Sequence, residues 1–205
     1  MKRLISALAL ASLAASASAL SIVATPAPGG TTGITPGAPG ATFDVVIPGF
    51  TAANGFVGSL SAVNPPGAVR YTFLGREAAA TNTFFNLGGS NQTITTSSAV
   101  GTSSLQSASG LLDFYFTSSL NATLVRNGQA GNGEPTFAIF SGGTSGYDYV
   151  LGFSDTGAGQ DKDYDDMVIG VTAVPEPETY MMMLAGLSAM AFVARRRRPQ
   201  ALAQG

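Results

Sequence analysis

Six aspartates lie close together near the end of the chain, and their type and spacing suit metal chemistry. Carboxylates at this density repel one another, and a hard cation with oxygen ligands relieves the repulsion. Calcium fits best, because it accepts roughly six to eight oxygens in flexible geometry. Asp161, Asp163, Asp165 and Asp166 are therefore candidate calcium ligands. They form the tightest part of the cluster Asp148, Asp155, Asp161, Asp163, Asp165 and Asp166.

A simpler alternative is a solvated acidic loop whose aspartates cap their own turn through side-chain hydrogen bonds. The cluster does not have the spacing of an EF-hand, because Asp166 stands where the turn glycine should be and Thr172 where the bidentate Glu should be. No cofactor other than calcium is indicated.

The composition excludes most catalytic chemistry. The 205 residues contain no Cys, His or Trp, so the chain has no disulfide, no thiolate or imidazole metal site and no Ser-His-Asp triad. No G-x-S-x-G motif occurs, and Lys162 is the only lysine between residues 20 and 174. We predict that the protein is not an enzyme; an exported hydrolase that uses a carboxylate pair is the third-ranked alternative.

The charge of the central region argues against nucleic acid as a partner. Residues 20–174 carry ten acidic and four basic side chains, a net charge of −6, whereas the two ends are positive. Such a region has no basic stripe for a phosphate backbone. We expect no nucleic-acid binding.

The elements that must position the aspartates are short strands separated by turn residues. Leu112, Phe114 and Phe116 alternate onto one face, and dipeptides such as Asn127-Gly128 mark turns between apolar runs. This spacing predicts an all-β fold, a β-sandwich or jelly-roll-like core over residues 42–174. Strands are expected at residues 42–47, 69–74, 83–86, 92–96, 111–116, 122–126, 136–140, 148–153 and 167–174.

The region before this core is rich in Pro and Gly. Such a composition disfavours regular elements, so residues 20–41 are predicted to be a linker or an extended arm.

The N-terminus has the three parts of a secretory signal peptide. Lys2 and Arg3 precede an apolar run, and Ala17 and Ala19 form an A-x-A cleavage site. A short membrane anchor is the alternative, but the run is too short to span a bilayer comfortably. We predict export and cleavage by signal peptidase after Ala19, so that residues 1–19 are removed.

The C-terminus combines a Pro-Glu-Pro triplet, an apolar run and a basic cluster. Pro175, Glu176 and Pro177 hold the backbone extended, and residues 179–194 are predicted to form a single apolar transmembrane helix. Four arginines resist translocation and should remain cytoplasmic, which predicts a stop-transfer anchor in the inner membrane. These are Arg195, Arg196, Arg197 and Arg198.

The order of these parts resembles the PEP-CTERM sorting signal of secreted proteins in bacteria that make exopolysaccharide. The resemblance covers residues 175–199 and implies recognition of Pro175, Glu176 and Pro177 by exosortase, a membrane enzyme that removes the helix. It implies a route and a destination and assigns no chemistry to the core. An ordinary Pro-rich spacer next to the membrane is the alternative.

The acidic cluster carries a second, shorter resemblance. The residues Asp161, Asp163, Tyr164, Asp165, Asp166 and Val168 resemble the Asp-x-Asp-[Tyr/Phe]-[Asn/Asp]-Asp-x-Val pattern that ends a secreted bacterial β-sandwich domain of unknown function. That resemblance implies calcium-associated turn carboxylates before a final strand, and no reaction.

Together these features predict a non-catalytic exported protein. It is anchored in the membrane by its C-terminal helix before processing and then sorted to the cell surface or the exopolysaccharide matrix. The alternative is a calcium-dependent carbohydrate-binding or adhesive module, which differs by a ligand site near the aspartates.

Overall fold

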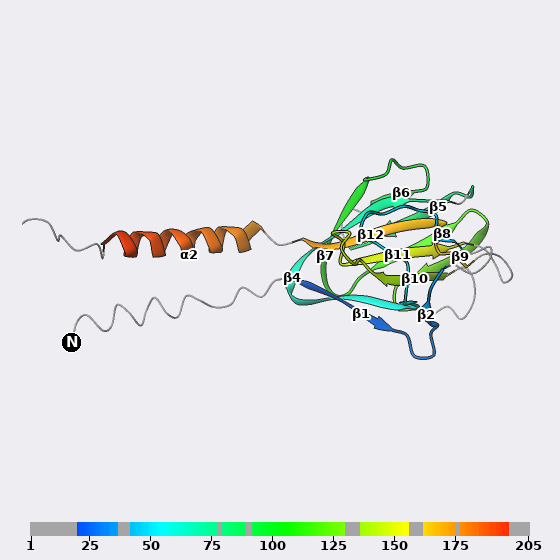
Figure 1. Cartoon of the computed structure of the whole chain (residues 1–205), viewed down its shortest axis with the longest axis horizontal. Coiled ribbons are helices and arrows are strands. Elements are labelled where there is room, and N and C mark those ends of the chain that lie inside the picture. The colour runs from blue at the N-terminus through cyan, green and yellow to red at the C-terminus, as the bar shows by residue number, and fades with distance from the viewer. Residues whose placement is uncertain are drawn as a thin grey trace, which may run out of the picture. The chain divides into compact units, whose positions relative to one another are not determined.

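The computed structural model describes residues 20–36, 42–77, 79–88, 92–129, 136–155, 162–174 and 177–196. The chain divides into two compact units. One is Leu20–Val174, which contains the strands; the other combines Met1–Ala19 with Pro175–Gly205, and its described part is helix α2 (Pro177–Arg196). Figure 1 labels these elements along the chain.

The larger sheet of the first unit has eight antiparallel strands, in the order β1-β4-β12-β11-β10-β3-β2, with β7 paired to β4 as well. Its last strand in the chain, β12, is therefore a central strand of the sheet. The strands are β1 (Ser21–Pro26), β2 (Thr32–Ile34), β3 (Gly55–Phe56), β4 (Gly58–Gly75), β7 (Ser103–Leu111), β10 (Thr136–Ser141), β11 (Tyr149–Ser154) and β12 (Met167–Val174).

The smaller sheet has four antiparallel strands in the order β6-β5-β8-β9. They are β5 (Asn82–Asn86), β6 (Thr93–Thr95), β8 (Phe114–Ser118) and β9 (Asn121–Arg126). The two sheets confirm the prediction of an all-β fold, and their packing fits a β-sandwich.

The main core lies between the two sheets and is rich in aromatic side chains. Phe116 of the smaller sheet stacks on Phe153 of the larger one, with ring centroids 4.9 Å apart and an interplanar angle of 7°. Tyr71 contacts Phe84 across the same interface at 4.9 Å. Leu112, Phe114 and Phe116 are all fully buried here, as their alternation predicts.

A second apolar cluster covers the other face of the larger sheet. Phe140, Val150 and Val168 of the sheet pack there against Ile47 and Tyr164, with Phe43 and Phe50 around them. Both faces of β10, β11 and β12 are consequently buried, which explains their continuous apolar sequences.

Residues 42–47, which form part of this cover, are not a strand, so that prediction is wrong. Their alternating apolar residues pack onto the sheet face, but the amides of Asp44 and Val45 donate to the side chain of Asp165. The hydrogen-bond pattern of the segment is therefore not that of a strand ladder.

The prediction that residues 20–41 are only a linker is also wrong for β1 and β2. β1 pairs with β4 over Ser21–Pro26, and β2 pairs with β3. β1 is an edge strand that ends at Pro26. Proline lacks an amide proton, and at the edge of a sheet this loses no hydrogen bond between central strands. The Pro and Gly content of the region did not reveal these two short strands.

Candidate functional site

The acidic segment lies where β4 ends and β12 begins. Val168 of β12 pairs with Gly75 of β4, and this register brings the residue pair Arg76–Glu77 beside the segment 162–166. The amide of Glu77 donates to the carbonyl oxygen of Asp165 over 2.9 Å. Strand pairing thus joins two stretches that lie almost 90 residues apart in the sequence.

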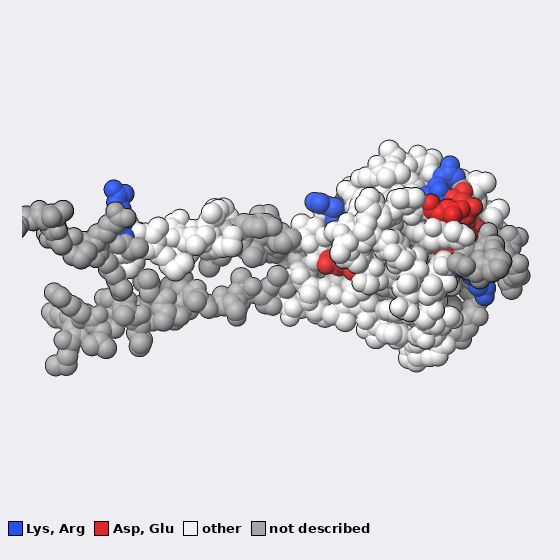
Figure 2. Space-filling model, viewed as in Figure 1, with Lys and Arg blue, Asp and Glu red and all other residues white. Residues whose placement is uncertain are grey.

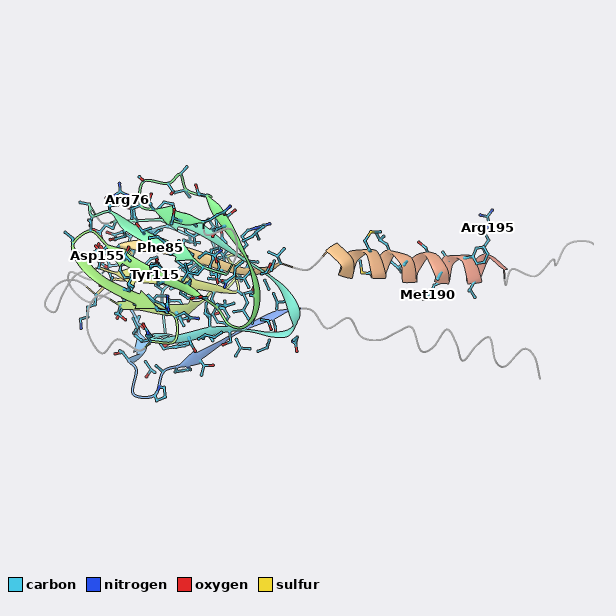
Figure 3. The ribbon with its side chains drawn as sticks, turned by 180° about the vertical axis from the view of Figure 1, so that it is seen from behind. Arg76, Phe85, Tyr115, Asp155, Met190 and Arg195 are labelled. Carbon is cyan, nitrogen blue, oxygen red and sulfur yellow. The ribbon has the colours of Figure 1, made fainter. Side chains whose placement is uncertain are left out.

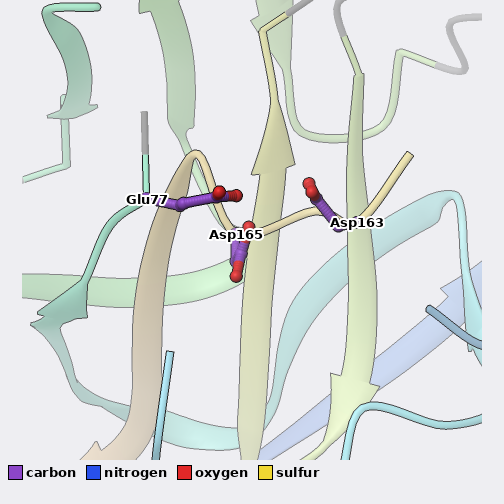
Figure 4. A group of neighbouring side chains, drawn as sticks. All are labelled: Glu77, Asp163 and Asp165. Carbon is purple, nitrogen blue, oxygen red and sulfur yellow. The ribbon is translucent and has the colours of Figure 1, made fainter. Parts of the chain in front are cut away.

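Three carboxylates converge at this junction. Glu77, Asp163 and Asp165 each offer an oxygen, and these oxygens all lie within 4.8 Å of one another. In Figure 4 the side chains of Glu77 and Asp163 point toward each other from opposite sides, with Asp165 between them. Glu77 is exposed, whereas Asp163 and Asp165 are 3% and 0% exposed.

The carboxylate of Asp165 has two different surroundings. Its Oδ2 accepts hydrogen bonds from the amides of Asp44 and Val45, the latter over 3.3 Å. Its Oδ1 is buried and has no hydrogen-bond partner among the described residues. Asp165 therefore holds residues 42–47, the cover segment, through one oxygen, while the other oxygen is buried without a hydrogen bond among the described residues.

Asp166 belongs to a neighbouring hydrogen-bond network and is absent from the group of converging carboxylates. Its Oδ2 accepts the amide of Asp155 over 2.8 Å, which closes the end of β11. Asn82 of the smaller sheet donates to Asp155 Oδ2 over 2.6 Å and to the carbonyl of Asp166 over 3.2 Å. This network links the two sheets at the same end of the sandwich.

A solvated acidic loop does not fit these aspartates, because Asp155, Asp163 and Asp165 are all buried. Two of the four predicted ligands, Asp163 and Asp165, come together, and Asp161 lies outside the described residues. Figure 2 shows acidic atoms gathered in a patch on the sandwich, with basic atoms directly beside them, on a face that is otherwise mostly uncharged.

Glu77 is the residue that the sequence prediction missed. It is the only acidic residue between Asp44 and Asp113, so no cluster of acidic residues in the sequence marks it as a ligand. The pairing of β4 with β12 would have been needed to find it.

Glycine 152 allows the acidic segment to lie close to the sheet. A Cβ atom at this position would stand 2.3 Å from the carbonyl oxygen of Tyr164 and 2.9 Å from its Cβ. Tyr164 itself has a φ of 63°, the left-handed region that few non-glycine residues adopt. The turn that presents Asp163 and Asp165 is therefore fixed by contact with β11.

Partly buried aromatic residues occur on the outer face of the smaller sheet. Phe85 and Tyr115, labelled in Figure 3, stack on each other at 4.5 Å with an interplanar angle of 12°. Arg126 lies over the Tyr115 ring at 5.8 Å, from the strand on the opposite side. Neighbouring side chains flank Tyr115 on both sides, so these rings do not form a flat open platform.

The C-terminal unit contains the predicted helix, and its apolar side chains are exposed. Met181, Leu184, Leu187 and Phe192 are each more than half exposed, and Figure 3 labels Met190 and Arg195 on the same helix. Within the described part of the chain, no helix is both long and apolar enough to cross a membrane. A helix therefore forms over the predicted residues 179–194, and it also includes Arg195 and Arg196. It begins at Pro177, so the expectation that this residue is extended is wrong, because proline is well suited to the first turn of a helix. The prediction that the helix spans the membrane is not supported.

Several predicted terminal residues lie outside the part of the chain that the structure describes. They are Ala17, Ala19, Pro175, Glu176, Arg197 and Arg198.

Comparison with known protein families identifies this tail. Residues 173–198 match the PEP-CTERM protein-sorting motif. The motif implies export, membrane-anchored sorting to the cell surface and processing by exosortase. It begins within β12, so the PEP-CTERM tail follows the β-sandwich directly.

The β-sandwich itself has no such match. Neither curated proteins nor solved structures match the chain, and the resemblance to a calcium-associated domain is unsupported. The role of the sandwich must therefore be argued from its own residues.

Proposed function

We propose that the β-sandwich is the non-catalytic cargo of the PEP-CTERM tail. The protein is exported after signal peptidase removes residues 1–19, is held at the inner membrane and is then processed by exosortase. The sandwich is deposited at the cell surface or in the exopolysaccharide matrix. The observation that carries this proposal is the sorting motif at residues 173–198, which begins in the last strand of the fold and continues beyond it.

The composition of the sandwich supports a passive role. Its few charged side chains, net charge of −6 and lack of Cys and His suit a component that coexists with polysaccharide and neither cleaves it nor binds nucleic acid. We expect no turnover of polysaccharide substrates by the folded protein.

The intact mass of the protein recovered from outside the cells tests the sorting route. In a bacterium that contains exosortase, we expect a mass that begins after Ala19 and ends before Tyr180. Replacing Glu176 with Ala within the triplet should retain the tail, whereas Glu178→Ala, just outside it, should be processed normally. A mass that includes the four arginines would contradict the proposal.

A calcium-dependent adhesive module is the second candidate, because Glu77, Asp163 and Asp165 converge at one end of the sandwich. If this candidate holds, a calcium chelator releases the protein from exopolysaccharide. If the protein is a passive matrix component, its retention does not depend on calcium.

A further inference from the structure

We infer that Glu77, Asp163 and Asp165 form a calcium site that joins the end of β4 to the start of β12. The site goes beyond the sorting route and does not depend on it. Two of its ligands come from the segment before β12, and Glu77 reaches it from the other strand.

The chemistry of the group suits a hard cation. Three carboxylates offer oxygens that lie within 4.8 Å of one another, and two of them, Asp163 and Asp165, are buried. Oxygen ligands of this kind are those that calcium prefers, and a bound cation reduces the repulsion between neighbouring carboxylates.

The unpaired oxygen of Asp165 is an independent indication of a ligand. Buried carboxylate oxygens in folded proteins nearly always have a partner, yet Oδ1 has none among the described residues. Its sister atom Oδ2 is engaged by backbone amides, so the side chain is fixed and cannot turn Oδ1 toward another donor. A metal ion is the partner that would satisfy it.

Other buried oxygens without partners occur nearby in the sheet. Thr136 and Ser154 are register partners on β10 and β11, and each has a buried hydroxyl oxygen with no hydrogen-bond partner among the described residues. Each lies two residues from Ala138 or Gly152 on its strand, so both side chains are on the sheet face against which Tyr164 packs. That face therefore holds two further buried oxygens without a hydrogen-bond partner among the described residues.

Calcium suits such a group better than magnesium does. Calcium accepts about six to eight oxygens at about 2.3–2.6 Å in flexible geometry, whereas magnesium demands a near-ideal octahedron. The oxygens of the three carboxylates lie within 4.8 Å of one another, close enough to share one ion. Exposed Glu77 gives the ion a route from solvent, and water can fill the remaining positions.

Calcium would then fix three parts of the chain together. Glu77 comes from the end of β4, Asp163 and Asp165 from the start of β12, and Asp165 Oδ2 holds the cover segment at Asp44 and Val45. Metal binding at this point should stabilise the whole end of the sandwich.

The test is titration of the full chain with calcium by isothermal calorimetry, together with thermal unfolding in calcium and in chelator. We expect one site, and a midpoint of unfolding several degrees higher when free calcium is about 100 times Kd. Glu77→Gln should weaken calcium binding about tenfold or more, because the charge of the ligands sets affinity. Asp113→Asn, which removes an exposed carboxylate elsewhere, should bind as the wild type does.

The midpoint in chelator separates metal binding from folding. The difference between the midpoints in calcium and in chelator, taken within each variant, reports metal binding whatever the substitution does to the metal-free fold. This difference should be several degrees for the wild type and much smaller for Glu77→Gln. Asp165→Asn is unsuitable, because it also disturbs the bonds to Asp44 and Val45. A wild-type protein that shows neither binding heat nor a calcium-dependent midpoint would overturn the inference, as would undiminished binding by Glu77→Gln.

Discussion

Tyr71 shows how one buried polar group can make the stability of the sandwich sensitive to pH. The side chain is fully buried between the sheets, and its hydroxyl donates to Gln106 Oε1. Burial raises the pKa of Tyr71 strongly, and the negative charge of Asp113 raises this pKa further. The folded state therefore keeps the phenol neutral under conditions in which the unfolded chain ionises.

The free energy of unfolding depends on pH only where the folded and unfolded states hold different numbers of protons. Below about pH 10 the Tyr71 phenol is protonated in both states, so it does not make the free energy of unfolding depend on pH. Above about pH 10 the unfolded state loses the proton first, and the free energy of unfolding falls by up to about 1.4 kcal/mol per pH unit. Denaturant titrations at several alkaline pH values should show a shallower fall for Tyr71→Phe than for wild type. Parallel curves for Tyr71→Phe and the wild type would contradict this assignment.

The residues of the candidate site were only partly predictable. Asp163 and Asp165 were predicted because acidic residues are dense around them. Asp166 lies in the same dense segment, but its side chain accepts the amide of Asp155 at the end of β11 and does not join the group. Glu77 has no local signal and enters through the register of β4 against β12. A high local density of acidic residues in the sequence indicates where carboxylates are close together. The pairing of strands determines which of these carboxylates lie within reach of one ligand.

At the scale of elements, the strands with alternating or continuous apolar residues were predicted best. The prediction of residues 167–174 matches β12 residue for residue, because this strand is apolar on both faces. β7 was missed because its buried side chains are Ser104, Gln106 and Ala108, while Leu105 points to solvent. Small and polar side chains of this strand face the core and an apolar one faces solvent, so the alternation of hydrophobic residues does not predict it.

The length of β4 was underestimated for a different reason. Its 18 residues include Asn64, which has a φ of 72°, followed by the sequence Pro65-Pro66, which is typical of a loop. In the structure β4 continues through these residues, and its register with β7 shifts between Ala62 and Gly67. Proline within a strand is tolerated at such bulges.

The contact between β11 and the acidic segment gives a prediction at the same scale. Gly152→Ala would place a methyl group against the Tyr164 carbonyl and should lower the free energy of unfolding by about 1–3 kcal/mol. Denaturant unfolding measures the change. Gly186→Ala is the matched control, because a Cβ at that position of α2 meets nothing within 4 Å. Equal stability of the two variants would show that the segment can move away from β11 without cost.

At the scale of the whole molecule, the fold depends on its last strand. β12 lies between β4 and β11 and supplies Met167, Ile169 and Val171 to the core between the sheets. A chain that ends at Asp166 should therefore lack cooperative thermal unfolding and be digested rapidly by protease. A chain that ends at Val174 keeps every strand and should unfold cooperatively; a sharp transition in the shorter chain would disprove the dependence on β12.

The place of β12 also sets when the protein can fold during export. The chain emerges from its N-terminus, so β1 arrives first and β12 arrives last, directly before the PEP-CTERM tail. Until that strand emerges, β4 and β11 have no partner between them and the apolar core stays open to water. Closure of the sandwich is thus delayed until the tail reaches the translocation channel. The sandwich can therefore fold only at about the time when the tail enters the membrane. A chain that pauses there has just gained the strand that its core needs to close.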